Sequence, residues 1–140
     1  MDKLFLDANV IFSAVCSDAG ASRFLFQLAG KKKIILFSSF YAVNEAKVNI
    51  ERKLKAEKLV LFYKLVSEFT KIDNFNYDFG KKYEKFIIEK DVPILVGAET
   101  MEADFLLTLD KKDFMNTKIS KLKLPFKIMS PGEYLRSLIK

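Results

Sequence analysis

The chain has 140 residues, half of them hydrophobic and 14 of them phenylalanine, so it is long enough for one domain with a sizeable core. Lysine and arginine number 24 and aspartate and glutamate 18, a net charge of +6 that suits a polyanionic partner such as nucleic acid and equally suits plain solubility. The absence of histidine excludes Ser-His-Asp and Cys-His catalysis and a histidine general base, and the single cysteine excludes an internal disulfide and a multi-cysteine zinc site.

Strands and helices are expected to alternate from the first residues onward. The run Lys-Leu-Phe-Leu at 3–6 predicts a short buried strand that ends directly on Asp7. A helical stretch follows and is expected to break near Gly20, and the apolar run at 33–37 predicts a second buried strand. Ser38 and Ser39 offer a helix cap after that strand. The helices expected in this half of the chain span 10–29, 41–54 and 57–69.

The second half of the chain continues the alternation. The sequence Asp-Val-Pro at 91–93 is typical of a helix start, with an acidic cap and a proline in the first turn. The elements expected here are a short strand at 71–72, helices at 78–89 and 91–102, strands at 104–109 and 126–129, and a terminal helix after Ser130. Alternating elements with continuously apolar strands favour a parallel sheet with helices on both faces. We therefore expect one domain over residues 1–140, a three-layer α/β/α sandwich.

Cysteine usage and hydropathy bear on the compartment. Cys16 stands among apolar residues and is expected to be a small core residue, and a single unpaired cysteine fits a reducing cytoplasm. The chain enters a strand after three residues, so no signal peptide is visible. No segment approaches the ~20 apolar residues of a membrane helix. We expect a cytoplasmic protein with no membrane partner.

Four acidic residues fall where a parallel sheet would bring them together. Asp7 and Asp110 each end a predicted strand, Asp91 begins a predicted helix, and Glu45 lies about two turns into another. The carboxyl ends of parallel strands share one edge, where ligands bind in open α/β sheets. Converging carboxylates repel one another, and divalent cations relieve that repulsion. Oxygen-only ligation suits Mg²⁺ or Mn²⁺, and a pair of such ions can activate water for phosphodiester cleavage.

Each of these acids also has a plain structural interpretation. Asp7 and Asp91 are in positions where aspartates commonly cap loops and helices. Glu45 alone would be a solvated helix residue, and Asp110 precedes Lys111-Lys112-Asp113 and would suit a polar turn. Their joint placement carries the interpretation as a site.

Other polar residues near these acids are assigned by position. Asn9 and Thr108 each lie two residues from one of the four acids, so their side chains are candidates to orient a ligand or a carboxylate. Asp104 opens the strand that Asp110 ends, six residues later and about 20 Å away, so Asp104 is expected to be structural. Asp113 and Glu89 are expected to be solvated surface.

The motifs around these residues resemble those of PIN-domain proteins. The stretch Leu-Asp-Ala-Asn-Val-Ile-Phe-Ser at 6–13 is similar to the opening of that family, and a serine pair followed by Glu45 is similar to its second acidic position. The run Asp-Val-Pro-Ile-Leu-Val-Gly-Ala at 91–98 resembles the third position. The run at 103–114, with Thr-Leu-Asp at its centre, resembles the fourth. The order and spacing match from about residue 4 to residue 114, with Ala8 where threonine is common.

The resemblance implies a three-layer α/β/α fold and a Mg²⁺- or Mn²⁺-dependent ribonuclease. It places Asp7, Glu45, Asp91 and Asp110 as catalytic metal ligands, with RNA as substrate. Many prokaryotic members are VapC-like toxins that bind an antitoxin protein and form homodimers, whereas others are housekeeping nucleases and some have lost activity. A catalytically silent module that binds nucleic acid or a protein partner is therefore the main alternative. An aspartyl-phosphate phosphatase with Asp7 as nucleophile fits less well, because Asn9 cannot act as the general acid. A receiver domain also fits less well, because its phosphoacceptor should follow a strand later in the chain.

Overall fold

A computed structural model, which describes residues 1–74 and 81–139, contains a sheet of five strands that all run parallel. The strands are β1 (Lys3–Leu6), β2 (Ile35–Ser39), β3 (Lys71–Asp73), β4 (Phe105–Leu107) and β5 (Lys127–Met129). They lie side by side in the order β3-β2-β1-β4-β5. The predicted parallel sheet is therefore confirmed, with the first strand of the chain at its centre.

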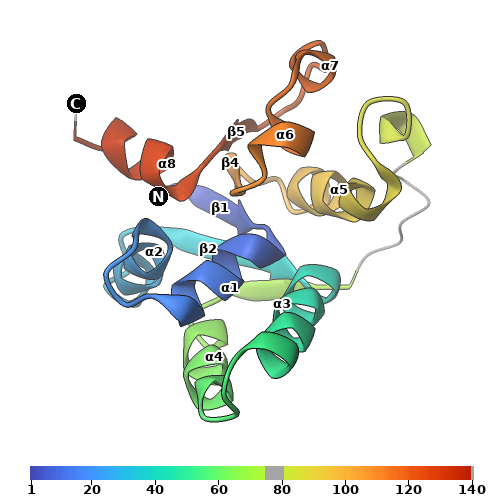
Figure 1. Cartoon of the computed structure of the whole chain (residues 1–140). Helices are drawn as coiled ribbons and strands as arrows, with labels where there is room; N and C mark the ends of the chain where they lie inside the picture. The colour runs from blue at the N-terminus through green and yellow to red at the C-terminus, as the bar shows by residue number, and fades with distance from the viewer. Residues whose placement is uncertain (75–80, 140) are drawn as a thin grey trace.

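Helices cover both faces of this sheet, as Figure 1 shows. They are α1 (Ala8–Cys16), α2 (Ala21–Gly30), α3 (Phe40–Lys53), α4 (Lys58–Val66), the 3₁₀ helix η2 (Glu89–Asp91), α5 (Val92–Thr100), α6 (Lys111–Phe114), α7 (Thr117–Ser120) and α8 (Pro131–Ser137). The helices α1 to α4 gather on one side, whereas α5 lies on the other side and contacts β2 and β4. The three-layer α/β/α sandwich expected from the alternation is the observed architecture.

The apolar strands form the centre of the core. Leu4, Phe5 and Leu6 of β1 are fully buried, because helices cover both faces of the sheet and leave no solvated side. Leu4 pairs with Leu36 of β2 on one side and with Phe105 of β4 on the other. This central, doubly covered position explains why β1 has a continuous apolar sequence rather than an alternating one.

The chain order places a topological switch point next to β1. The chain passes from β1 to β2 and β3 on one side, and then returns to β4 and β5 on the other side. The crevice beyond the carboxyl ends of β1 and β4 is the place where such sheets bind ligands. Asp7 follows β1 directly and Thr108 follows β4 directly, so both stand at this crevice.

The prediction of a helix at 78–89 is wrong for residues 81–89, the part of it that the structure describes. Residues 78–80 lie outside the described residues, 81–88 form a 3₁₀ turn and further turns, and Glu89 begins η2. Tyr83 and Ile87 are buried four residues apart, which is the spacing of one face of a helix. The hydroxyl of Tyr83 instead donates to Glu99 Oε2 of α5 at 2.6 Å, so a tertiary contact fixes this segment against α5. Packing has overridden the local periodicity here.

Two smaller expectations also change. Cys16 is exposed, because it is the last residue of α1 and the chain leaves the helix toward solvent at Ser17. The short helices α6 and α7 were not expected from the sequence. Each is capped by a side chain of the preceding residue, since Asp110 accepts from Asp113 N and Asn116 accepts from Ile119 N.

Candidate metal centre

The carboxylate of Asp7 joins the end of β1 to the start of α1. Its backbone N–H donates to the carbonyl of Leu107 at 3.0 Å, and its side chain is 5 % exposed. The Oδ1 atom accepts from the N–H of Ala8 at 2.7 Å and so caps α1. The capping interpretation is therefore correct for one oxygen only, because Oδ2 is held by side chains from elsewhere in the fold.

Asn9 and Thr108 form a small hydrogen-bond network around that second oxygen. The Thr108 hydroxyl donates to Asp7 Oδ2 at 2.8 Å and accepts from the N–H of Asp110 at 3.1 Å. Asn9 donates weakly to Asp7 Oδ2 at 3.4 Å and to Thr108 Oγ1 at 3.3 Å. Its amide oxygen accepts from the N–H of Leu109 at 3.1 Å. These hydrogen bonds link Asp7 to the chain that follows β4.

Burial changes the acidity of Asp7. Desolvation raises its pKa from 3.8 to about 6, even though the hydrogen bonds from Thr108 and Ala8 oppose this change. The negative charges of Glu45 and Asp110 raise the pKa further. Asp7 thus sits in a place where negative charge is costly and where nearby carboxylates increase the cost.

Asp91 shows the same effect more strongly. It precedes α5 and is 8 % exposed, yet its side chain makes no cap hydrogen bond. Its backbone is helical, with φ −97° and ψ −9°, because η2 runs directly into α5. A side chain that caps a helix normally reaches the helix amides from an extended backbone, which Asp91 lacks. The Oδ2 atom of Asp91 is buried with no hydrogen-bond partner. The capping interpretation of Asp91 is therefore wrong.

Burial also raises the pKa of Asp91 from 3.8 to about 8, which leaves it largely protonated near neutral pH. A side-chain hydrogen bond with Asp113 and the charge of Asp7 raise the pKa in the same direction, and the positive charge of Lys90 opposes them. A buried carboxylic acid with a spare oxygen beside other carboxylates is a group that a cation would deprotonate and bind.

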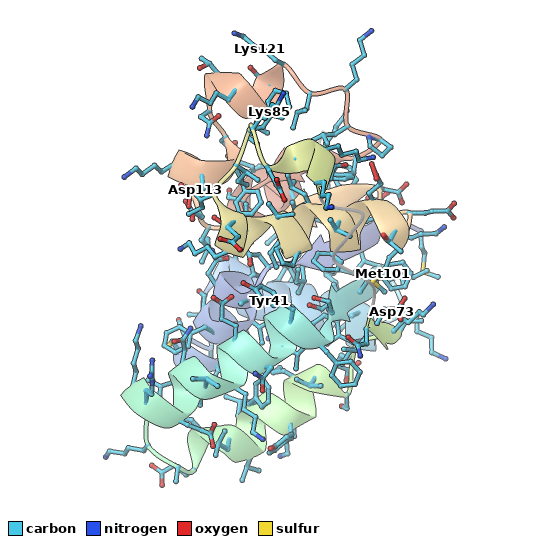
Figure 2. All side chains as sticks on the ribbon, turned by 90° about the vertical axis from the view of Figure 1, so that its right-hand side faces the viewer. Tyr41, Asp73, Lys85, Met101, Asp113 and Lys121 are labelled. Atoms are coloured by element: carbon cyan, nitrogen blue, oxygen red, sulfur yellow. The ribbon has the colours of Figure 1, made fainter. Side chains whose placement is uncertain are left out.

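Three carboxylate oxygens lie within 4.8 Å of one another, one each from Asp91, Asp110 and Asp113. Asp110 caps α6 through its Oδ1, and Asp113 lies one turn further on in the same helix. Figure 2 shows Asp113 beside the N-terminal end of α5, at the opposite end of that helix from Met101. Asp113 is half-buried, so its interpretation as solvated surface is wrong, whereas Glu89 is exposed as expected.

A cavity of about 230 Å³ joins Asp91 and Asp110 to the N-terminal part of the site. It is lined by Asp7, Ala8, Asn9, Phe12, Glu45, Asn49, Lys53, Lys90, Asp91 and Asp110. All four acids expected from the sequence therefore face one cavity. Glu45 lines it from α3 and is exposed, and among the described residues it lies outside the tight group that Asp91, Asp110 and Asp113 form.

A family model described as "PIN domain" matches residues 3–112 of the chain. The chain belongs to the PIN-domain family. The match includes all four expected acids and ends one residue before Asp113. The resemblance read from the motifs is therefore confirmed.

Solved structures of other proteins share the fold of this PIN domain. VapBC2 from Rickettsia felis bound to a DNA fragment from its promoter gives a TM-score of 0.68 at 18 % identity, covering 91 % of this chain and 98 % of that one. PAE2754 from Pyrobaculum aerophilum gives 0.60 at 14 % identity, covering 99 % and 91 %. FitAB bound to an IR36 DNA fragment gives 0.58 at 19 %, covering 91 % and 94 %. At these identities the likeness concerns the fold. No curated protein sequence matches this one at a significant level.

The donor set of this PIN domain fits a hard divalent cation. Asp91 contributes a buried oxygen without a partner, and Asp110 and Asp113 contribute carboxylates close to it. Mg²⁺ and Mn²⁺ prefer oxygen ligands, whereas the histidine and thiolate ligands that zinc favours are absent from the cavity lining. In the described part of the chain no helix has the length and apolarity needed to cross a membrane.

Several residues at the site were not expected from the sequence. Asp113 follows Asp110 by one turn of α6. Its place near Asp110 was missed because a polar turn was expected where α6 forms. Asn49 and Lys53 follow Glu45 at spacings of four and eight, which places all three on one face of α3. That spacing was the available signal for both residues.

Proposed function

We propose that this PIN domain is a metal-dependent endoribonuclease that hydrolyses phosphodiester bonds of RNA with Mg²⁺ or Mn²⁺ held by its acidic cavity. The observation that carries this proposal is Asp91, a buried acid with an oxygen to which no protein group donates a hydrogen bond, next to two further carboxylates. A carboxylate in that state gains most from a cation, because the cation replaces the proton that burial forces onto it.

The residues around the cavity have distinct tasks in this proposal. Asp91, Asp110 and Asp113 would hold the cation. Asp7 and Glu45, which line the cavity together with Asp91 and Asp110, would bind a second ion or orient water. When bound, the cation supplies positive charge for the phosphate under attack and for activation of water. Thr108 and Asn9 hold the Asp7 carboxylate in place through the hydrogen bonds described above.

RNA is proposed as the substrate on grounds of charge and family. The net charge of +6 attracts a polyanion toward a cavity whose acids need cations to accept a phosphate.

Two of the structures that share the fold, VapBC2 and FitAB, are complexes bound to DNA fragments. We therefore also propose that the chain is a VapC-like toxin with an antitoxin protein as partner and a second copy of itself as a further partner. Growth arrest on expression, relieved by co-expression of a small neighbouring reading frame, tests the toxin assignment.

The nuclease assignment is tested by Asp7→Asn, with Asp104→Asn as a matched control. Asp104 precedes β4, at the end of that strand away from Asp110 and the cavity, and accepts a hydrogen bond from the N–H of Lys3 at 2.8 Å. The same chemical change there leaves the cavity intact. With single-stranded RNA and Mn²⁺, Asp7→Asn is expected to lose cleavage by at least about 100-fold, as losses of preorganised electrostatic groups commonly do, and Asp104→Asn is expected to retain it. Equal cleavage by wild type and Asp7→Asn in a clean preparation would contradict the assignment of Asp7, and no cleavage by the wild type would favour the catalytically silent module.

A further inference from the structure

The acidic cavity also contains two positive side chains, those of Lys53 and Lys90. They come from different elements, since Lys53 is the last residue of α3 and Lys90 belongs to η2. The charge of Lys90 acts on Asp91, where it opposes the rise in pKa. Lys90 is the chain neighbour of Asp91, so its place beside the acids follows from η2, and Lys53 is the cation whose purpose needs a separate explanation.

Lys53 contacts an aromatic ring that lines the same cavity. Its ammonium lies 5.7 Å from the ring centroid of Phe12, a cation–π contact with the wall of the same cavity. Among the described residues the ion pairs are Lys71–Asp73 and Lys82–Glu99, so Lys53 pairs with no acid there. A lysine that served only to neutralise the acids would be expected to contact one of them.

The arrangement along α3 separates the two kinds of charge. Glu45, Asn49 and Lys53 occupy one face of the helix, and eight residues correspond to about 12 Å along its axis. The cavity thus has an acidic end near Glu45 and a basic end near Lys53, with the Asn49 amide between them. An acidic end suits cations, whereas a basic end next to it suits an anion attached to the same substrate.

We propose that Lys53, oriented by Phe12 and assisted by Asn49, forms a subsite for a backbone phosphate next to the one that is cleaved. This inference rests on the proposed nuclease function and goes beyond it by naming how the substrate chain is held. The substrate is a nucleic-acid strand whose backbone follows α3 out of the acidic cavity. Lysine suits this task because it contacts phosphate as a point charge, independently of the base sequence.

The test is the binding of a fluorescent, unstructured oligouridine by anisotropy in Mg²⁺, with its length checked on a gel after each titration. Lys53→Met keeps the length of the side chain and removes its charge. Lys55→Met removes the same charge from an exposed position two residues further on that is outside the cavity lining. Lys53→Met is expected to weaken binding about tenfold and to flatten the plot of log K against log salt by about 0.7, the value for one lost phosphate contact on a single strand. Lys55→Met is expected to stay within about twofold of wild type in affinity.

Two further variants separate charge from structure. Lys53→Arg is expected to restore binding, and Phe12→Leu is expected to weaken it by less than Lys53→Met, since the ammonium remains but is no longer oriented. Equal binding by Lys53→Met and Lys55→Met, or no binding by the wild type, would overturn the subsite. So would tighter Mn²⁺ binding by Lys53→Met with unchanged oligonucleotide affinity, because that result would make Lys53 a counter-charge for the acids. Binding that depends on Lys53 without any cleavage would retain the subsite and contradict the nuclease assignment.

Discussion

At the scale of single residues, the cavity combines groups that are costly when charged with groups that keep them in place. Asp7 and Asp91 are both buried and both have raised pKa values, to about 6 and about 8. Thr108 and Asn9 fix the Asp7 carboxylate, whereas one oxygen of Asp91 has no protein partner. The Asp7 carboxylate thus receives hydrogen bonds from the protein itself, and Asp91 is the residue that we propose gains most from a bound cation.

Asp91→Asn is expected to stabilise the metal-free protein at pH 8. The wild-type carboxyl must lose its proton in a buried place as the pH rises toward about 8, and the amide has no proton to lose. Relief of a buried, poorly paired polar group corresponds to about 1–3 kcal/mol. Urea unfolding at pH 8 without divalent ions measures the difference. A variant no more stable than wild type would show that the Asp91 carboxylate is not strained there.

Thr108→Val is expected to raise the pKa of Asp7 above about 6, because the Thr108 hydroxyl stabilises the charged carboxylate. It also removes the acceptor for the N–H of Asp110, so the free energy of unfolding should fall by about 1–3 kcal/mol. Thr108→Ser keeps the hydroxyl and serves as the control. Carbon NMR titration of the Asp7 carboxyl in the metal-free protein reads the pKa directly, and an unchanged value in Thr108→Val would contradict the role of this hydroxyl.

At the scale of elements, the strands and the helix starts at the cavity were predictable, because they have local signals. The apolar run of β1 that ends on Asp7 and the Asp-Val-Pro start of α5 gave the positions of two acids. The segment 81–89 was not predictable, since its conformation depends on the contact of Tyr83 with Glu99 on another element. The tight group of Asp91, Asp110 and Asp113 depends on α6, a four-residue helix too short to produce a periodic pattern.

The position of Asp91 depends on a contact between elements that can be removed. The Tyr41 hydroxyl of α3 donates to the carbonyl of Lys90 at 2.6 Å, and Figure 2 shows Tyr41 on the α3 side that faces α5. Tyr41→Phe is expected to lower the free energy of unfolding by about 1 kcal/mol and to weaken Mn²⁺ binding, because η2 would be held less firmly. Tyr63→Phe, at an exposed tyrosine of α4, is the control. Mn²⁺ affinity equal to wild type in Tyr41→Phe would show that this contact does not position the site.

At the scale of the whole molecule, the order of the strands brings the acids together. Asp7 and Asp110 are far apart in the chain but meet because β1 and β4 are neighbours at the switch point of the sheet. The sequence could predict a parallel sheet and the shared edge, since these follow from alternating elements. It could not predict which oxygens stay unpaired, because that depends on side-chain packing between α5, α6 and the strands.

The pH dependence of stability without metal follows from the raised pKa values. A carboxyl whose pKa is higher in the folded state stabilises that state below its unfolded pKa, and this stability is lost as pH rises through the folded pKa. For Asp7 the change from 3.8 to about 6 corresponds to about 3 kcal/mol, lost between about pH 4 and pH 6, and the Asp91 loss extends to about pH 8. Divalent cations should therefore raise Tm more at pH 8 than at pH 5. Thermal unfolding with Mn²⁺ and with EDTA at both pH values measures this, and equal shifts would contradict it.

Direct calorimetric titration of Mn²⁺ at pH 8 tests the metal centre most closely. Wild type is expected to bind Mn²⁺ saturably and to gain about 2.7 kcal/mol of stability at 100 times the dissociation constant. Asp104→Asn should bind like wild type, because Asp104 lies at the opposite end of β4. Asp91→Asn should lose that binding. Equal Mn²⁺ binding by Asp91→Asn and Asp104→Asn, or no binding by the wild type, would contradict the assignment of the acidic cavity as a divalent-cation site.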